Sequence, residues 1–372
     1  MRIAQVAPLY ERVPPTMYGG TERVVSYLTE ELVRLGHDVT LFASGDSLTA
    51  ARLRAPCERA TRLDTTCQDP LARHILMLGA VYERADEFDI IHSHVDYLCL
   101  PLARLSRVPT VLTLHGRLDM PELPALYNTY SDVPLVSISD AQRTPLPKAN
   151  WVATIHHGLP DLYRYVPERG RYLLFLGRIS PEKCPDTAIR VARRTGIPLR
   201  IAAKVDPVDQ KYFETLRPLF DDPLVEMVGE VGEDGKQELL GGALALLFPI
   251  DWPEPFGLVM IESLACGTPV IARPRGSVAE VIQNGETGWI CETEDEMVDA
   301  VRRLDQIDRA TCRAAFERQF TVETMARHYL DVYDAVRVAR RVPRAQPAAS
   351  DALLDADDLN VRHEAASLEP SS

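Results

Sequence analysis

The stretch PIDWPEPFGLVMIESLACG, residues 249–267, lies where an apolar strand-like run passes into a helix-like pattern. Two prolines flank Glu254 and stop regular structure there, so we expect its carboxylate to be presented from an irregular turn rather than packed. Gly257 allows close backbone approach, and the three- and four-residue spacing from Leu258 to Ala265 predicts a helix that Gly267 ends. The stretch therefore predicts a strand, an irregular turn that presents a carboxylate, and a helix.

The same stretch indicates a binding site. Amide groups near Phe256, Gly257 and Leu258 point out of a helix N-terminus, which favours a phosphate or a sugar hydroxyl. Glu262, one turn into the helix, can accept two hydrogen bonds from a vicinal diol such as ribose. Eight helical residues span about 12 Å, whereas retaining glycosidases hold their two carboxyls about 5 Å apart. Inverting glycosidases hold them roughly 6.5–9.5 Å apart, so the spacing excludes an inverting enzyme less firmly than a retaining one. We therefore favour a clamp on a long ligand over a glycosidase pair. Taken alone, the stretch is also typical of an exposed turn followed by an ordinary amphipathic helix, and the other segments decide between these two.

Outward from this stretch, short β-branched runs alternate with longer helical patterns, which is typical of parallel βαβ layers. The first set of expected strands is Ile3–Ala7, Val39–Ala43, Ile90–His94, Thr110–His115, Leu135–Ile138 and Val152–Ile155. A polar segment at 158–170 separates them from a second set, Tyr172–Leu176, Leu199–Ala203, Val225–Val228, Leu244–Phe248 and Val270–Ala272. The sequence thus predicts an α/β protein with two doubly wound domains, 1–163 and 164–320, facing across a ligand-binding cleft.

The two ends of the chain complete this organisation. Thr21 is a candidate N-cap for a sheet-covering helix that reaches Leu35 and stops at Gly36. Residues 321–341 form a further helical pattern, while residues 342–372 are rich in Ala, Ser, Asp and Pro without periodicity and are expected to be disordered. The sequence Asp355-Ala-Asp357 in that tail resembles a metal-binding DxD by spelling only.

Two loops carry further chemistry. Gly177-Arg178-Ile-Ser-Pro-Glu-Lys183 follows the first strand of the second set, and its two cations can converge on a diphosphate, unless they are only solvated loop cations. Gly19 and Gly20 precede the first helix and let amides approach an anion, although a glycine turn before a helix is common. No GxGxxG dinucleotide fingerprint is present there.

Three histidines lie at strand ends. His92 and His94 form an HxH pair without further assigned ligands for zinc, so we interpret them as a structural pair. His115 is followed by Gly116 at another strand end, which makes a position facing the cleft equally plausible. There it would hydrogen-bond a sugar or phosphate oxygen.

Composition bounds the class of protein. The 372 residues are 46% hydrophobic and carry a net charge of −13, which supports real cores and argues against nucleic acid as a partner. The seven cysteines form no CxxC pair and indicate reduced thiols. No apolar run is long enough to span a membrane and no signal peptide is evident. We therefore expect a cytoplasmic protein; attachment to the inner face of a membrane stays open, because a lipid-linked acceptor would lie there.

The motifs GGTE at 19–22, GRISPEK at 177–183 and EPFGLVMIE at 254–262, in this order, resemble the retaining glycosyltransferases of family GT4, which have the GT-B fold. The resemblance covers about residues 1–340, and the last motif matches the E-x7-E signature of the family. The opening IAQVAPLYERVPP and the run FASGDS at 42–47 look like a bacterial branch associated with surface or exopolysaccharide assembly.

The resemblance implies a role for each matched residue. Arg178 and Lys183 would bind the donor diphosphate, Glu254 the sugar hydroxyls and Glu262 the ribose. His115 matches a histidine that lies near the sugar, and Cys184 departs from the family because glycine often follows the lysine. Backbone groups would meet the sugar and the phosphates at Gly19, Gly20, Phe256, Gly257 and Leu258.

The resemblance also implies the reaction. We expect a hexosyl group to move, with retention, from a nucleotide sugar to a glycan or lipid-linked saccharide, with UDP-glucose ahead of UDP-galactose and GDP-mannose. No cofactor or essential metal is expected, and the C-terminal helix would cross back to the first domain. The alternatives are a nucleotide-sugar epimerase, a phosphorylase, for which no pyridoxal-phosphate lysine motif is evident, and a non-catalytic nucleotide-sugar-binding protein.

Overall fold

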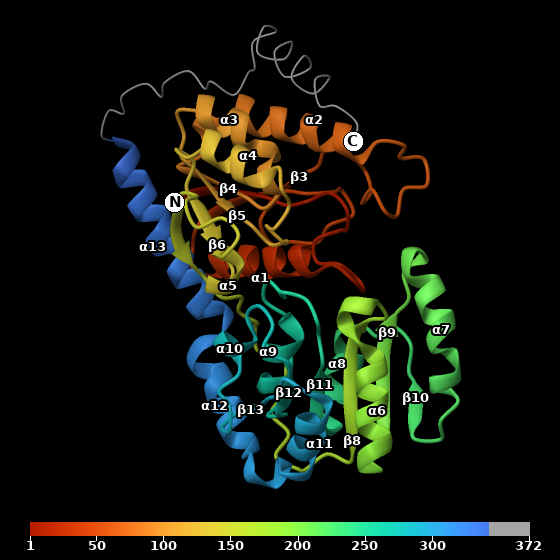
Figure 1. Ribbon diagram of the computed structural model, residues 1–372. Coiled ribbons are helices and arrows are strands. Elements are labelled where there is room, and N and C mark those ends of the chain that lie inside the picture. Colours follow the sequence, from red (N-terminus) through yellow and green to blue (C-terminus); the bar gives the residue numbers. More distant parts are fainter. Residues whose placement is uncertain (342–372) are drawn as a thin grey trace, which may run out of the picture.

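The computed structural model describes residues 1–341, which form two α/β domains stacked one above the other (Figure 1). Both domains contain a parallel sheet covered by helices on its two faces. The predicted fold class, two doubly wound Rossmann-like domains facing across a cleft, is confirmed. The expected tail at 342–372 and its Asp355-Ala-Asp357 lie outside the described residues.

The N-terminal sheet has the strand order β3-β2-β1-β4-β5-β6-β7, and every neighbouring pair is parallel. Its strands are β1 (Arg2–Val6), β2 (Asp38–Phe42), β3 (Arg52–Arg54), β4 (Ile90–Ser93), β5 (Thr110–Thr113), β6 (Leu135–Ser137) and β7 (Trp151–Thr154). Its helices are α1 (Gly20–Arg34), α2 (Pro70–Glu83), α3 (Leu100–Leu105), α4 (Leu123–Thr129) and α5 (Asp140–Arg143). Successive residues of β1 serve opposite faces: Ile3 packs in the core with Val24 of α1, and Ala4 with Met77 of α2.

The C-terminal sheet has the order β10-β9-β8-β11-β12-β13 and is also parallel throughout. Its strands are β8 (Tyr172–Arg178), β9 (Leu199–Lys204), β10 (Val225–Met227), β11 (Ala243–Phe248), β12 (Val270–Ala272) and β13 (Gly288–Ile290). Its helices are α6 (Pro185–Thr195), α7 (Gln210–Phe220), α8 (Glu233–Gly242), α9 (Leu258–Ala265), α10 (Val278–Val281), α11 (Glu294–Arg302) and α12 (Arg309–Gln319). The strand order reverses between β8 and β11, as it does between β1 and β4, and such switch points are where open α/β sheets bind ligands.

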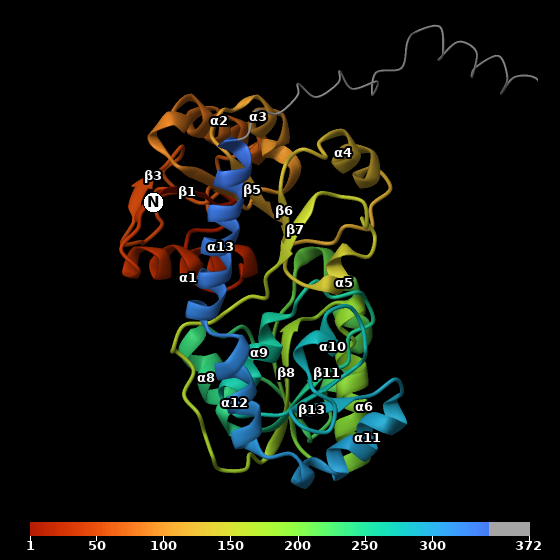
Figure 2. The same cartoon turned by 90° about the vertical axis from the view of Figure 1, so that its left-hand side faces the viewer.

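Helix α13 (Val322–Arg341) ties the domains together. It leaves the C-terminal domain and runs along the N-terminal domain (Figure 2), where it packs against α1. The chain crosses between the domains at 155–171 and near 320, and the two crossings bond to each other: Leu159 N–H donates to Phe320 O and Val322 N–H to Leu159 O, at 2.9 Å each. The predicted domain limits after 163 and 320 fall at these two crossings.

Polar contacts also join the domains beside the cleft. Glu280 of α10 accepts hydrogen bonds from the backbone N–H groups of Asp140 and Ala141, both at 2.8 Å, at the N-terminus of α5. Ser139 Oγ donates to the carbonyl of Pro255 at 2.6 Å. The turn around Glu254 is thus anchored to the opposite domain.

Three local expectations need correction. Helix α1 begins at Gly20 with Gly19 as its N-cap and without a side-chain cap bond, so Thr21 is not the cap but lies in the first turn. The strands β3 and β13 were not expected, because β3 has a single apolar residue between two arginines and β13 begins with a glycine, which is depleted in strands.

Candidate active site

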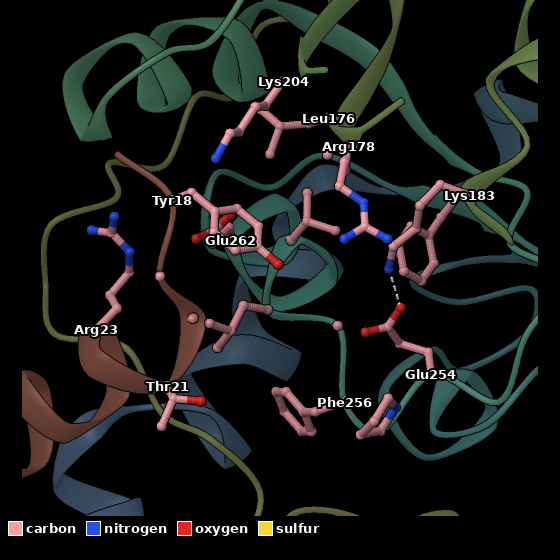
Figure 3. Close-up of a pocket in the computed structure, with 18 of the residues that line it drawn as sticks. Tyr18, Thr21, Arg23, Leu176, Arg178, Lys183, Lys204, Glu254, Phe256 and Glu262 are labelled. Atoms are coloured by element: carbon pink, nitrogen blue, oxygen red, sulfur yellow. Dashed lines mark hydrogen bonds and ion pairs between the residues drawn. The ribbon is translucent and has the colours of Figure 1, made fainter. Parts of the chain in front are cut away.

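A cleft with a volume of about 750 Å³ separates the two domains (Figure 3). Its walls come from the loop after β1, the ends of β5, β8, β9 and β11, and the start of α9. The structure brings all the predicted site residues to it: Gly19, Gly20, His115, Arg178, Lys183, Glu254, Phe256, Gly257, Leu258 and Glu262.

Glu254 lies at the C-terminal wall in an ion pair with Lys183 (dashed line in Figure 3). Trp252 Nε1 donates a second hydrogen bond to the same carboxylate oxygen at 2.9 Å. Lys183 Nζ also lies 5.1 Å from the centre of the Trp252 ring, within cation–π range. The Glu254 side chain is only 12% exposed, so the expectation of a freely presented carboxylate was wrong: the turn presents it, but Lys183 and Trp252 hold it.

Two helix N-termini meet in the cleft. Helix α9 begins at Leu258 after Gly257, which has a φ of 76°, and α1 begins at Gly20 after Gly19, which has a φ of 140°; neither helix has a side-chain cap. A Cβ added to Gly20 would lie 3.8 Å from Leu258 Cδ1, so the two helix starts are close neighbours. Their free amides and aligned dipoles favour an anion between them.

Glu262 lies in α9 with 2% of its side chain exposed. Lys236 Nζ of α8 contacts it at 3.0 Å and contacts Glu233 at 3.1 Å. Glu233 pairs in turn with Arg23 of α1 at 2.6 Å, across the two domains. A chain of ion pairs thus connects the predicted ribose contact to the first helix of the opposite domain.

Arg178 is surrounded by carboxylates. It forms an ion pair with Glu182, and its guanidinium lies 3.6 Å from Asp206 and 3.2 Å from Asp209. Burial opposes its charge, but Glu182 and Asp209 raise the pKa of Arg178 above its ordinary value. Both Arg178 and Lys183 have acidic partners in this structure, so neither is only a solvated loop cation.

Cys184 keeps the backbone shape of this loop. Its φ of 50° and ψ of 53° lie in the left-handed region, which glycine adopts most readily. It follows the short 3₁₀ turn Pro181–Lys183, and its N–H donates to Pro181 O at 3.2 Å. The departure from glycine therefore leaves the turn that presents Lys183 in place.

The HxH histidines are structural. His92 Nδ1 lies 2.6 Å from Tyr333 Oη and its Nε2 lies 2.7 Å from Thr113 Oγ1. His94 bonds to Gln5 Oε1 and to His115 Nε2, at 2.9 Å each. Both imidazoles are buried with both nitrogens occupied, in agreement with the interpretation as a structural pair.

His115 lines the N-terminal wall together with His157, whose ring stacks on it at 5.3 Å. Burial lowers the pKa of His115 to about 3 and the pKa of His157 well below its ordinary value, so both rings are neutral. Among the described residues, the Nδ1 atoms of both rings are buried and have no hydrogen-bond partner.

The lining residues that were not predicted include Tyr18, Arg23, His157, Lys204 and Lys236. Two sequence signals were available, because Tyr18 and Arg23 flank the glycine loop and Lys204 ends strand β9 as Arg178 ends β8. Lys204 Nζ lies 5.1 Å from the centre of the Tyr18 ring across the cleft. No local pattern marks Lys236, whose role depends on contact with Glu262.

Within residues 1–341, His, Cys, Asp and Glu side chains nowhere gather in a group of three that could hold a metal ion. No helix in this part of the chain is both long and apolar enough to cross a membrane. The metal-independence expected from the resemblance remains a prediction.

Known proteins are similar to this chain in sequence and in fold. The family described as Glycosyltransferase Family 4 matches residues 18–138, and the family described as Glycosyl transferases group 1 matches residues 165–314. Glycogen synthase of Mycobacterium tuberculosis is 29% identical over 95% of this chain and 100% of its own length.

Two solved structures have the same fold. Sucrose-phosphate synthase of Thermosynechococcus elongatus superposes with a TM-score of 0.76 at 17% identity, over 91% of this chain and 100% of its own. Anabaena HepE in complex with UDP-glucose superposes with a TM-score of 0.69 at 16% identity, over 90% of this chain and 100% of its own. With both domains matched in order, this chain belongs to the group 1, family 4 glycosyltransferases and has their GT-B fold.

Proposed function

We propose that the protein transfers a hexosyl group, with retention of configuration, from a nucleotide sugar to a glycan or lipid-linked saccharide. The ion pair between Lys183 and Glu254 carries this proposal. In a nucleotide sugar the hexose is bonded directly to the terminal phosphate, so its phosphate oxygens and sugar hydroxyls are neighbours. A cation and a carboxylate in contact match those two neighbouring groups.

The donor fits the cleft in one direction. Its diphosphate lies between the N-termini of α1 and α9, with Lys183 and Arg178 beside it, and its ribose lies at Glu262. Phosphate oxygens compete with Glu254 for Lys183 and with Glu182 for Arg178, so donor binding exchanges existing ion pairs for new ones. The Glu254 carboxylate is then free to accept hydrogen bonds from the sugar hydroxyls.

Transfer follows from this placement. The bond between the anomeric carbon and the leaving diphosphate oxygen breaks, and an acceptor hydroxyl bonds to the same face of the sugar. The proton of that hydroxyl passes to the departing diphosphate. The amides and the cations stabilise the charge that develops on the diphosphate, which is the main catalytic contribution and requires no divalent metal.

UDP-glucose is the favoured donor. Structural similarity to HepE, whose complex contains UDP-glucose, supports this choice. Sequence similarity to a glycogen synthase supports a glycan acceptor. The proposed biological role is surface polysaccharide assembly. The transfer would take place in the cytoplasm, with a lipid-linked acceptor at the inner face of the membrane.

The first test is a donor screen. Nucleotide release is measured with UDP-glucose, UDP-galactose and GDP-mannose, in EDTA, with glycan and lipid-linked acceptors and without an acceptor. We expect acceptor-dependent release of UDP and an α-linked product. Epimerisation of the free donor without an acceptor would instead indicate an epimerase, and no release with any donor would count against catalysis.

Two variants then test the roles in the cleft. Glu254→Ala is expected to reduce transfer on the order of 10²-fold without weakening UDP binding, because the sugar contact is lost while Lys183 is released from its ion pair. Lys183→Ala is expected to weaken binding of UDP itself, because the diphosphate loses a cation. Calorimetry with UDP and transfer assays separate the two effects. Equal and negligible effects would refute the assignment of this cleft.

A further inference from the structure

A buried chain of hydrogen bonds connects the cleft to helix α13. His115 Nε2 lies 2.9 Å from His94 Nδ1, and His94 Nε2 lies 2.9 Å from Gln5 Oε1. Gln5 Nε2 donates to Tyr333 Oη at 3.1 Å. Four side chains from β1, α13 and the ends of β4 and β5 thus join the N-terminal wall of the cleft to the helix behind the sheet.

The chain continues beyond Tyr333. Its hydroxyl lies 2.6 Å from His92 Nδ1, His92 Nε2 lies 2.7 Å from Thr113 Oγ1, and Thr113 Oγ1 lies 3.1 Å from Tyr329 Oη. These four side chains are fully buried. Tyr329 therefore occupies the far end of this series of hydrogen bonds, where its hydroxyl bonds to Thr113 and not to Gln5 or His94.

The three histidines in this series of hydrogen bonds, His92, His94 and His115, are uncharged. Burial lowers the pKa of His92 and His94 well below the ordinary value, and it lowers the pKa of His115 to about 3. A neutral imidazole has one N–H and one lone pair. In a hydrogen bond between two neutral imidazoles, either ring can therefore be the donor. A third group that contacts one of the rings determines which ring donates.

Gln5 is that third group. Its oxygen faces His94, so it can only accept, and His94 must carry its proton on Nε2. The Nδ1 atom of His94 is then a lone pair, which accepts the proton of His115 Nε2–H. In this orientation the nitrogen of Gln5 donates to Tyr333 Oη, and the hydroxyl proton of Tyr333 is directed to His92 Nδ1.

The remaining nitrogen of His115 is then an acceptor without a partner. Its Nδ1 atom is buried and unsatisfied among the described residues, while the His115 side chain lines the cleft. A buried acceptor that lacks a hydrogen bond is unfavourable. A ligand hydroxyl can donate to it, whereas a fully ionised phosphate oxygen cannot.

We infer that Gln5, His94 and Tyr333 are positioning residues that hold His115 in the tautomer protonated on Nε2, so that His115 Nδ1 accepts a hydrogen bond from a substrate hydroxyl. The tautomer rests on the orientation of the Gln5 amide in the structure, and the hydroxyl rests on the proposed function. Of the two partners considered for His115, a sugar oxygen and a phosphate oxygen, this inference selects the sugar hydroxyl.

Two variants of α13 form a matched pair. Tyr333→Phe and Tyr329→Phe each remove one buried hydroxyl from the same helix, but only Tyr333 contacts Gln5. The tautomer is measured by ¹⁵N NMR of the histidine side chains in the full-length protein without ligand, and His115 is assigned by the signal lost in His115→Gln. We expect a protonated Nε2 and a bare Nδ1 in the wild type and in Tyr329→Phe.

In Tyr333→Phe the Gln5 amide can turn, so the two nitrogen shifts of His115 should move toward each other. A wild-type His115 protonated on Nδ1, or identical spectra for the two variants, would overturn the inference. This measurement needs no substrate, so it stands even if no nucleotide sugar is turned over.

Kinetics test the hydroxyl. We expect Tyr333→Phe to lower kcat/KM for the nucleotide sugar about 2- to 10-fold, the factor that one neutral hydrogen bond contributes, without changing the inhibition constant of UDP. Tyr329→Phe should leave both constants unchanged. Mixed tautomers with an unaltered kcat/KM would overturn the assignment of His115 as a hydroxyl acceptor.

Discussion

The two walls of the cleft differ in how they satisfy their polar groups. On the C-terminal wall, Lys183 and Lys236 each contact a carboxylate, in the pairs Lys183–Glu254 and Lys236–Glu262. On the N-terminal wall, His115 and His157 are neutral, and each leaves a buried nitrogen unpaired. The C-terminal wall is thus suited to a charged ligand group that exchanges ion pairs, and the N-terminal wall to hydroxyls.

The two sides of the cleft also differ in the space around their backbone. A substitution that fills this space near Glu254 has the largest expected effect on transfer. Gly276 has a φ of 57°, and a Cβ there would lie 2.2 Å from the carbonyl oxygen of Glu254. We expect Gly276→Ala to displace the turn that carries Glu254. A misplacement of about 1 Å can lower a rate on the order of 10²-fold, and a transfer assay should show a loss of that size in kcat/KM.

Gly116 of the N-terminal wall provides the control. It lines the cleft, and a Cβ there would meet nothing within 4 Å. We expect Gly116→Ala to change kcat/KM less than about 3-fold, well below the loss from a misplaced catalytic group. Thermal melting and circular dichroism check that Gly276→Ala folds. If this variant were as active as Gly116→Ala, or did not fold, the tight fit around Glu254 would not account for the contribution of the C-terminal wall to transfer.

Carboxyl groups on the two sides also respond differently to pH. Glu22 of α1 is buried, and burial raises its pKa to about 7. Glu233 on the C-terminal side is also partly buried, which opposes its charge, but Lys236 and Arg23 lower its pKa. Because the folded pKa of Glu22 exceeds the unfolded value of 4.5, its contribution to stability is complete below pH 4.5 and is lost as the pH rises through 7.

Glu22→Gln tests this difference. Between pH 4.5 and 7 the shift corresponds to a loss on the order of 3 kcal/mol in the free energy of unfolding. The variant should therefore unfold at a higher temperature than the wild type at pH 8, with the gap closing toward pH 4.5. Calorimetric melting across this range measures the gap. A gap that is constant with pH would mean that Glu22 is already charged in the folded protein.

The sequence predicted the parts of the cleft that a local pattern encodes. Strand ends followed by Gly177 or by two prolines around Glu254 identify the βα junctions, and parallel sheets bring such junctions to one edge. The conformation of Cys184 was in doubt only because its residue type departs from the glycine of the family.

The partners in the site could not be predicted in the same way. Lys183 and Glu254 were each identified, but their contact joins positions 71 residues apart. Lys236 meets Glu262, and Arg23 meets Glu233, only because α8, α9 and α1 converge at the cleft. The hydrogen-bond chain to Tyr333 spans 328 residues from Gln5. Long-range pairing of this kind follows from the packing of the two domains and leaves no periodic signal in the sequence.

The smallest expected effect concerns the carboxylates around Arg178. Asp209 lies 3.2 Å from the guanidinium and competes with any phosphate that approaches it. Asp209→Asn removes one negative charge there while Glu182 and Asp206 remain, so UDP should bind more tightly. Ion pairs with partial exposure contribute up to about 1 kcal/mol, so we expect a gain of about 2- to 5-fold in affinity.

Asp222→Asn is the matched control, because it makes the same change in charge at the pair with Arg193, which the cleft does not include. Calorimetric titration with UDP at two salt concentrations should show the gain only for Asp209→Asn, and a smaller gain at high salt because salt screens the competing charge. Weaker binding by Asp209→Asn would mean that Asp209 orients Arg178 for the diphosphate, so that the C-terminal wall would depend on its carboxylates for geometry and not only for charge balance.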